Sequence, residues 1–367
     1  MPTVADVLRR YGDEYLERFG ARMPAEQRKV LQAIRACRTG ALGTVHYACE
    51  TCGRTHVMGR SCGNRHCPTC QQHKTKTWLE KQLARLLPCP YFLLTFTLPA
   101  ELRDFARQHQ RVVYDSLFAA SSQAIRELAA DEKFIGSSRC GFFGVLHTWG
   151  RSLDYHPHVH YVVPGGAVND AGDEWLPSGA AFFLPVAVLS ILFRAKFRDL
   201  LNEAGLLNQI DPAVWRRDWV VHSQAVGDGR ASLAYLAPYV FRVALSDRRI
   251  ISCDDGRVTF SYRKSGDKHW RKMTVDAMEF IRRFLQHVLP RGLQKVRHYG
   301  FLAANSKLSV EAARWLVTLY NGGVFALLAL TAITPTPRPV PRCAECNGPL
   351  RIVAVIPRQA PQVFDSS

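Results

Sequence analysis

Apolar residues recur at intervals of three and four positions in several long stretches of the chain. In the first stretch, Val4, Leu8, Tyr11, Tyr15 and Phe19 fall on one face of a helix. Charged residues fill the positions between them, so the pattern is that of an amphipathic helix packed on a core. The same spacing predicts helices at 4–19 and 24–38, and 185–206 is expected to form an amphipathic helix. Further helices are expected at 73–87, 101–130, 231–245 and 274–288.

Shorter runs rich in β-branched and aromatic residues predict strands. The run YFLLTFTL at 91–98 is closed by Pro99 and is expected to form a buried strand. GFFGVLHTW at 141–149 and HVHYVVPGG at 158–166 are joined by a polar loop, which predicts an antiparallel hairpin. Further strands are expected at 219–226 and 257–264.

The composition indicates a globular protein with a phosphate-rich partner. Of 367 residues, 47% are apolar and 22% are charged, which suits a substantial core and two or three domains. Lys and Arg number 48 against 31 Asp and Glu, giving a net charge of +17. Such an excess attracts nucleic acid independently of its sequence. An ordinary basic protein without that partner is the alternative.

The chain carries no apolar stretch long enough to be a membrane span. The longest one, around 324–333, is too short, and the charged N-terminus lacks an apolar signal core. We therefore expect no membrane partner and a location in a bacterial-type cytoplasm, associated with the nucleoid when DNA is bound. In that reducing compartment, clustered cysteines indicate metal binding before disulfides.

Two cysteine pairs have the spacing of a structural zinc site. Cys49 and Cys52 form the first pair, Cys67 and Cys70 the second, and fourteen residues separate the pairs. Each pair offers two thiolates to a tetrahedral ion, so four of them predict a closed structural Zn²⁺ site. Nearby residues of ligand type replace one of these or form a second site, and spacing does not decide between the two: Cys37, His56, Cys62 and His66.

A third pair lies in the tail, where Cys343 and Cys346 follow the Pro-rich stretch at 333–342. This pair has the form of half a zinc ribbon. It completes a site with distant cysteines or with another subunit, or it is a remnant.

Three histidines are expected to meet on one face of the predicted hairpin. His158 and His160 flank one valine, and alternate residues of a strand point to the same side. If the two strands pair, His147 falls almost opposite His158 and completes a site for a divalent ion. Otherwise His147 is a hydrogen-bonded strand residue, and His156 or Asp154 supplies the third ligand.

Tyr235 and Tyr239 lie four residues apart, so a helix would stack them one turn above the other. Such pairs usually pack in a core. Beside a metal site, however, a phenol can attack phosphorus and hold a covalent phosphotyrosine, and two phenols can hold two DNA ends. Neighbouring cations could activate the phenols or bind phosphate: Arg242, Arg248 and Arg249.

The segment from Arg263 to Arg297 carries ten Lys or Arg against three acidic residues, with aromatic residues between them. Bases of single-stranded DNA stack on such rings while the cations follow the phosphates. The alternative is a solvated basic face whose rings point inward. The DNA-binding candidates in this segment are Lys264, Trp270, Arg271 and Lys272.

As a set, these motifs resemble the rolling-circle transposases of the insertion sequence 91 family, within the HUH endonuclease superfamily. The resemblance extends from about residue 24 to 305. It is carried by SCGNRHCPTCQ (61–71), FTLP (96–99), LHTWG (146–150), HPHVHYVVPGG (156–166), YLAPYVFRVALSD (235–247) and FLQHVLPRGLQKVRHYGFLA (284–303).

The resemblance implies an α+β fold, in which a ferredoxin-like central antiparallel sheet is flanked by helices and preceded by a helical zinc-binding domain. We expect the chain to divide into a helical and zinc-binding part at 1–87, a catalytic part at 88–310 with the tyrosine helix, and a tail at 311–367 with a helix, a Pro-rich linker and a CxxC pair. The tail carries little of this resemblance. His158 and His160 match the family's metal ligands for Mg²⁺ or Mn²⁺. Tyr235 and Tyr239 match its catalytic tyrosines.

The expected function is therefore nicking and transfer of single-stranded DNA at transposon ends and target, through 5′-phosphotyrosine linkages. His147 matches a third metal ligand of related relaxases. A rolling-circle replication initiator or relaxase would use the same chemistry at an origin. A zinc-dependent DNA-binding regulator without catalysis is the alternative from another class. The sequence does not indicate whether the protein is a monomer or an oligomer.

Overall fold

A computed structural model of the chain describes residues 1–150, 152–241, 245–263, 269–322 and 340–358. These residues belong to two compact units. The first unit combines Met1–His73, Phe241–Val288 and Thr334–Ser367, and the second combines Lys74–Val240 and Leu289–Ile333. The units differ from the three consecutive parts expected from the sequence, because strands from distant segments pair within each of them.

A five-stranded antiparallel sheet in the order β12-β4-β5-β3-β8 forms the centre of the second unit. Its central strands are largely buried, since helices cover both faces of the sheet. The strands are β3 (Tyr91–Thr97), β4 (Phe142–Trp149), β5 (Tyr155–Pro164), β8 (Val221–Ala225) and β12 (Val296–Tyr299). A separate two-stranded sheet pairs β6 (Gly166–Val168) with β7 (Trp175–Pro177).

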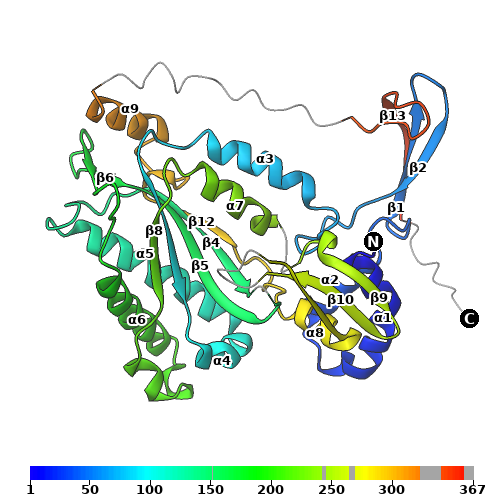
Figure 1. Cartoon of the computed structure of the whole chain (residues 1–367), viewed down its shortest axis with the longest axis horizontal. Coiled ribbons are helices and arrows are strands. Elements are labelled where there is room, and N and C mark those ends of the chain that lie inside the picture. The colour runs from blue at the N-terminus through cyan, green and yellow to red at the C-terminus, as the bar shows by residue number, and fades with distance from the viewer. Residues whose placement is uncertain (151, 242–244, 264–268, 323–339, 359–367) are drawn as a thin grey trace, which may run out of the picture. The chain divides into compact units, whose positions relative to one another are not determined.

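Helices cover both faces of this sheet (Figure 1). On one face, Phe96 and Tyr161 pack in a core with residues of α5 (Gln110–Ala130) and α6 (Val186–Glu203), beside the short α4 (Arg103–Gln108). The Tyr161 hydroxyl is satisfied there by Ser121 Oγ at 2.7 Å.

The opposite face carries a second core. Val145 and Val162 pack there with Leu233 and Leu236 of α7 (Arg230–Phe241). Residues of α3 (Gln72–Leu83) and α9 (Val310–Tyr320) complete this core. Because side chains alternate along a strand, this is also the face to which His158 and His160 point, two residues away from Val162. The sheet therefore presents its histidines to α7.

The first unit contains α1 (Val4–Phe19), α2 (Ala25–Arg35) and α8 (Ala277–Leu285), with a three-stranded antiparallel sheet of β9 (Ile250–Asp254), β10 (Arg257–Tyr262) and β11 (Arg271–Asp276). Helix α1 begins with a capping box. The Asp6 N–H donates to Thr3 Oγ1 at 3.1 Å, and the Asp6 carboxylate accepts from the Thr3 N–H at 2.8 Å.

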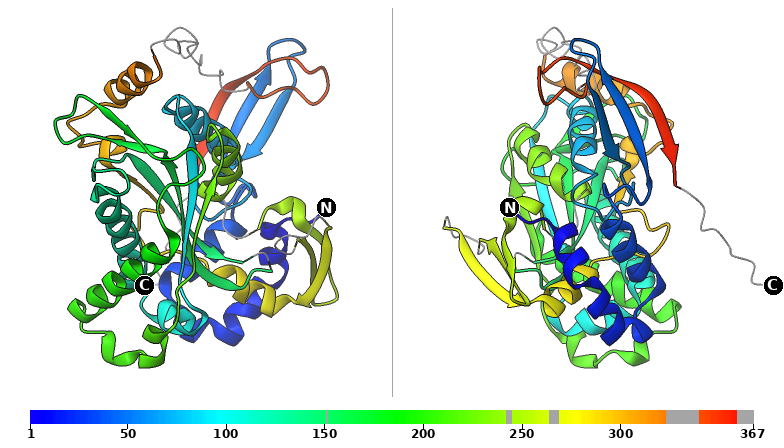
Figure 2. Two further views of the ribbon diagram at one scale, coloured as in Figure 1. Left: turned by 60° about the vertical axis from the view of Figure 1, so that its left-hand side comes forward. Right: turned by 90° about the vertical axis from the view of Figure 1, so that its right-hand side faces the viewer.

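A second sheet of the first unit pairs strands from the N-terminal and the C-terminal parts of the chain. The hairpin of β1 (Gly43–Cys49) and β2 (Thr55–Gly59) pairs through β1 with the C-terminal strand β13 (Leu350–Pro357). Figure 2 shows β13 in red beside the blue hairpin. The antiparallel register runs from Gly43 opposite Pro357 to Cys49 opposite Leu350.

The expected fold class, antiparallel sheet with flanking helices, is confirmed. The expected helix at 101–130 is two helices, because His109 departs from helical geometry with φ −117° and ψ 39°. The sequence predicted β3, β4, β5, β8 and β10, but not the strands β1, β2, β6, β7, β9, β11, β12 and β13. In the part of the chain that the structure describes, no helix combines the length and apolarity that a membrane span requires.

Candidate active site and metal-binding clusters

The β4–β5 hairpin brings three histidines together on one face of the central sheet. His147 lies directly opposite His158, as the spacing predicted, and Val145 lies opposite His160. The His147 ring centroid is 5.1 Å from that of His158 and 4.6 Å from that of His160. One ring nitrogen from each histidine lies within 4.8 Å of the other two.

Hydrogen bonds direct one nitrogen of each ring toward the cluster. His158 Nδ1 lies 2.7 Å from the His156 carbonyl oxygen, and since a carbonyl only accepts, Nδ1 carries the proton. His160 Nδ1 is 2.8 Å from Thr95 Oγ1. These contacts leave both Nε2 atoms for a ligand, because a hydrogen bond to one ring nitrogen of a metal-bound histidine orients the other toward the ion. His147 Nε2 is buried and has no hydrogen-bond partner among the described residues.

Burial also fixes the charge of the cluster. It lowers the pKa of His147 and of His158 well below the ordinary 6.5, with the neighbouring imidazoles adding to the effect. Burial, with a contribution from His156, lowers the pKa of His160 to about 4. The rings are therefore neutral at pH 7, the state in which imidazole binds a metal. The unpartnered Nε2 of His147 fits a bound cation.

The two competing ligands are engaged elsewhere. His156 Nδ1 lies 3.1 Å from the Arg103 guanidinium, and Asp154 accepts a hydrogen bond from Ser152. Neither belongs to the cluster of ligand atoms. Pro157 does not interrupt β5, and its carbonyl accepts a hydrogen bond from the Leu98 N–H at 3.2 Å.

Helix α7 presents both tyrosines to the histidines. Leu233 and Leu236 are fully buried and anchor the helix on the sheet. The Tyr239 ring centroid is 4.8 Å from that of His147, and the Tyr235 centroid is 6.4 Å from that of His160. The two phenol rings are 5.2 Å apart. Tyr235 is 45% exposed and Tyr239 is half-buried, so neither ring is enclosed in the core.

Two residues that the sequence did not assign to the site border it. Trp149 stacks on His147, with ring centroids 5.4 Å apart and an interplanar angle of 9°. Lys295 Nζ donates to the Tyr239 carbonyl oxygen at 2.6 Å and lies 4.6 Å from the Trp149 ring centroid. Both residues lie in segments that the sequence singles out, since Lys295 belongs to the basic segment and Trp149 ends the predicted strand that carries His147. Nothing in the spacing links them to Tyr239.

The first unit contains a cluster of four cysteines near the C-terminal end of α2. Cys67 Sγ lies 3.7 Å from Cys37 Sγ, and Cys62 Sγ lies 3.7 Å from Cys70 Sγ. Hydrogen bonds with Cys62 and Cys70, reinforced by burial, raise the pKa of Cys67. The four thiols therefore do not ionise together without a cation, and a divalent ion such as Zn²⁺ suits this donor set.

The other two predicted zinc ligands belong to a different cluster. Cys49 and Cys52 lie with Cys343 and Cys346 of the tail, not with Cys67 and Cys70. The single four-cysteine site predicted from the sequence is thus corrected to two clusters. The physical reason is that Cys49 ends β1, whose partner strand β13 brings the tail pair beside it.

Two of the predicted DNA-binding residues, Arg242 and Lys264, lie outside the described residues. The others belong to the first unit. Trp270 is 63% exposed, and Arg271 and Lys272 begin the edge strand β11. Arg248 and Arg249 lie on a short 3₁₀ turn, where Arg249 Nε donates to the Ser261 carbonyl at 2.7 Å.

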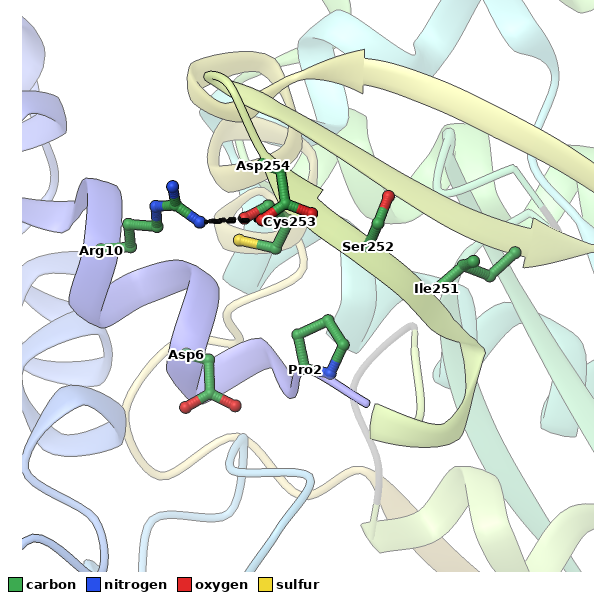
Figure 3. Close-up of a pocket in the computed structure, with 7 residues that line it drawn as sticks. All are labelled: Pro2, Asp6, Arg10, Ile251, Ser252, Cys253 and Asp254. Atoms are coloured by element: carbon green, nitrogen blue, oxygen red, sulfur yellow. Dashed lines mark hydrogen bonds and ion pairs between the residues drawn. The ribbon is translucent and has the colours of Figure 1, made fainter.

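A pocket of about 260 Å³ lies within the first unit, and Figure 3 shows the residues that line it. Arg10 lines this pocket and donates to the Cys253 carbonyl at 2.5 Å and to the Asp254 carboxylate at 3.1 Å. The pocket holds none of the predicted site residues. Its lining is Pro2, Asp6, Arg10, Ile251, Ser252, Cys253 and Asp254.

Comparison with known proteins agrees with this arrangement. A family model described as "Putative transposase" matches residues 141–309, which include the histidines and tyrosines. A second model, described as "Transposase zinc-binding domain", matches residues 7–98. No solved structure matches the chain significantly.

Two curated proteins are similar over most of their length. "Putative transposase y4qJ" of Sinorhizobium fredii is 41% identical over 322 residues, which are 82% of this chain and 80% of that protein. The "Transposase for insertion sequence element IS801" of Pseudomonas savastanoi pv. phaseolicola is 28% identical over 334 residues, 83% of this chain and 74% of that protein. With both family models matched and this identity over most of its length, the chain belongs to the insertion sequence 91 family of transposases.

Proposed function

We propose that this transposase nicks single-stranded DNA at the ends of its element and transfers the strand through 5′-phosphotyrosine intermediates. One observation carries the proposal. Three neutral imidazoles and two partly exposed phenols converge on the same face of one sheet, with the Tyr239 and His147 rings 4.8 Å apart. Core tyrosines would be buried, and structural histidines would have hydrogen-bond partners on their buried nitrogens.

His147, His158 and His160 would hold a divalent ion, Mg²⁺ or Mn²⁺. When bound, such an ion polarises the scissile phosphate and stabilises the leaving oxygen. Mg²⁺ is usually bound through carboxylates and phosphates, so three imidazoles favour Mn²⁺ of the two. The burial that keeps these rings neutral supports this role, because a protonated imidazole has no lone pair to offer.

Tyr235 and Tyr239 would act as nucleophiles. The phenol oxygen of one attacks phosphorus and loses its proton, the bond from phosphorus to the 3′ oxygen breaks, and that oxygen leaves as a 3′ hydroxyl after gaining a proton. The phosphotyrosine retains the energy of the cleaved linkage for the later joining step. A ring separation of 5.2 Å would let the second phenol receive another strand beside the same three histidines.

The Cys37, Cys62, Cys67 and Cys70 cluster would hold a structural Zn²⁺. All four residues lie within the range matched by the zinc-binding family model, and four protein ligands leave no open position for catalysis.

The decisive experiment is covalent trapping. The full chain is incubated with Mn²⁺ or Mg²⁺ and single-stranded oligonucleotides from the ends of its own element, and 5′-phosphotyrosine adducts are resolved under denaturing conditions. We expect an adduct that is abolished in the Y235F/Y239F double variant and in H158A/H160A. A matched control is Tyr320→Phe, since Tyr320 is a similarly exposed tyrosine of the same unit on α9.

The alternatives predict different results. An unchanged adduct in the double tyrosine variant would overturn the assignment of the nucleophiles. Absence of any adduct on the element's own ends, with DNA binding intact, would favour a regulator without catalysis. Adducts on duplex and single-stranded DNA in equal amounts would overturn the single-strand preference.

A further inference from the structure

The second cysteine cluster joins residues almost three hundred positions apart. Cys49 Sγ lies 3.4 Å from Cys346 Sγ, and Cys52 Sγ lies 3.8 Å from Cys343 Sγ. Four thiolates around one Zn²⁺, each bonded at about 2.3 Å in a tetrahedron, are about 3.8 Å from one another. The sulfurs are thus at the spacing of a tetrathiolate site and well beyond the roughly 2.0 Å of a disulfide.

The two pairs have matching backbone geometry. Gly53 and Asn347, the residues after the second cysteine of each pair, are both left-handed, with φ of 74° and 58°. In each pair that residue donates its N–H to the carbonyl of the first cysteine at 3.0 Å, from Gly53 to Cys49 and from Asn347 to Cys343. Two equivalent turns facing each other are how paired zinc knuckles present four thiolates.

The cysteine side chains of this cluster are closely packed. Cys49 and Cys343 are 4% and 3% exposed and pack with Leu350. A Cβ added to Gly348 would lie 2.3 Å from Thr51 Oγ1 and 3.1 Å from Cys49 Sγ, so the tail approaches the hairpin as closely as glycine permits.

A histidine also faces the cluster. His56 Nε2 on β2 lies 3.2 Å from Cys343 Sγ. A donor at that distance suits a metal-bound thiolate, since the ligands of a metal site commonly accept hydrogen bonds from neighbouring groups.

We propose that Cys49, Cys52, Cys343 and Cys346 bind a second structural Zn²⁺, which fastens the C-terminal strand to the β1–β2 hairpin. Neither family model accounts for this site, because half of its ligands lie beyond both matched ranges, 7–98 and 141–309. The tail pair is then neither a remnant nor half of an intermolecular site. The proposal is independent of the nicking reaction.

Native mass spectrometry of the full chain tests the site directly. We expect a single chain that carries two zinc ions in its cysteine clusters. Cys52→Ser and Cys346→Ser should each lower the zinc content by one ion per chain, and the C52S/C346S variant should lose the same single ion. Comparison with the parent chain cancels any zinc held elsewhere. Cys89→Ser, which changes a cysteine outside both clusters, should leave the content unchanged.

A conservative variant separates ligation from misfolding. Cys346→His retains a zinc ligand and should keep both ions. With Co²⁺ in place of Zn²⁺, this variant should shift the visible bands to shorter wavelength, because one thiolate is replaced by nitrogen. Hydrogen exchange gives a second readout, in which β13 amides at 350–357 are protected in the parent and become unprotected in Cys52→Ser, although that substitution lies in the N-terminal hairpin.

Three results would overturn the proposal. The first is a zinc content that Cys346→Ser does not change. The second is a loss of two ions in C52S/C346S where each single variant loses one, which would mean that the two pairs bind separate ions. The third is the second ion appearing only in species that contain two chains.

Discussion

At the scale of residues, the histidine cluster couples the stability of the second unit to pH. In metal-free protein, burial lowers the pKa of His147, His158 and His160 below 6.5, to about 4 for His160. The unfolded chain binds protons at these residues below about pH 6.5, whereas the folded chain does not until the pH falls much further. Protonation therefore favours unfolding in this window.

We predict that the free energy of unfolding of the second unit falls as the pH drops from 6.5 toward 4. The slope is up to about 1.4 kcal/mol per pH unit for each histidine. Urea denaturation in EDTA at several pH values measures it. Replacing His158 and His160 by Gln should flatten the dependence, while His222→Gln, at an exposed position, should not. A stability that is independent of pH in the parent would contradict the prediction.

Lys295 is a candidate positioning residue for Tyr239. Its ammonium group holds the Tyr239 carbonyl and lies over Trp149, so it fixes the end of α7 beside His147. Lys295→Met keeps the aliphatic stem but removes the charge and the hydrogen bond. We predict that adduct formation by Lys295→Met falls roughly tenfold, the effect of about 1.4 kcal/mol on a barrier. Single-turnover rates measure this decrease.

Two further variants test whether a decreased rate in Lys295→Met comes from the lost hydrogen bond. Lys295→Arg should restore part of the rate, because a guanidinium can donate to the same carbonyl. Lys133→Met removes an exposed lysine of the same unit and should have no effect. A rate for Lys295→Met equal to that of Lys133→Met would exclude a role for Lys295.

At the scale of elements, β4 combines two functions on its two faces. One face carries His147, and on the other Gly144 lies opposite Tyr161, whose ring covers it. A Cβ at Gly144 would lie 2.4 Å from Tyr161 Cε1. We predict that Gly144→Ala destabilises the second unit by about 1–3 kcal/mol, since overpacking displaces a buried ring.

The measurement is urea denaturation of the second unit. Gly150→Ala is the control, because an added Cβ there meets its nearest neighbour at an ordinary 3.8 Å. If Gly144→Ala is as stable as Gly150→Ala, the Tyr161 ring is free to move and the packing argument fails.

Elements whose partners are near in sequence were predictable. The hairpin of β4 and β5 needs only a short turn, so spacing alone placed His147 opposite His158. Helix α7 falls almost entirely within the segment expected to be helical, 231–245, and the four-residue spacing put Tyr235 and Tyr239 on adjacent turns. The α+β class followed from the resemblance and from these elements together.

Pairings between distant segments were not predictable. The partner of Cys49 depends on the pairing of β1 with β13, across roughly three hundred residues of chain. A CxxC pair has the same local form whichever second pair it faces, so the grouping of Cys49 and Cys52 with Cys67 and Cys70 was the simplest choice by sequence distance. Likewise, no local pattern relates Lys295 to Tyr239.

At the scale of the whole molecule, the net charge of +17 and the exposed aromatic residues make separable contributions to DNA binding. Cations release counterions from phosphates, which makes affinity fall with salt. A ring that stacks on a base contributes about 1–3 kcal/mol that does not depend on counterions. Trp270 is 63% exposed beside Arg271 and Lys272 at the start of β11, so both contributions can be tested there.

We predict that Trp270→Ala weakens single-stranded DNA binding by about 5- to 150-fold at every salt concentration, the equivalent of one stacked base. Replacing Arg271 and Lys272 by Gln should instead reduce the slope of log affinity against log salt, by about 0.7 for each phosphate that is no longer neutralised. Fluorescence anisotropy from 50 to 300 mM salt, roughly the range over which such interactions weaken, separates the effects. Trp315→Ala, at a similarly exposed tryptophan of the second unit, is the control. Equal reductions in affinity for the two tryptophan variants would show that Trp270 does not stack on DNA.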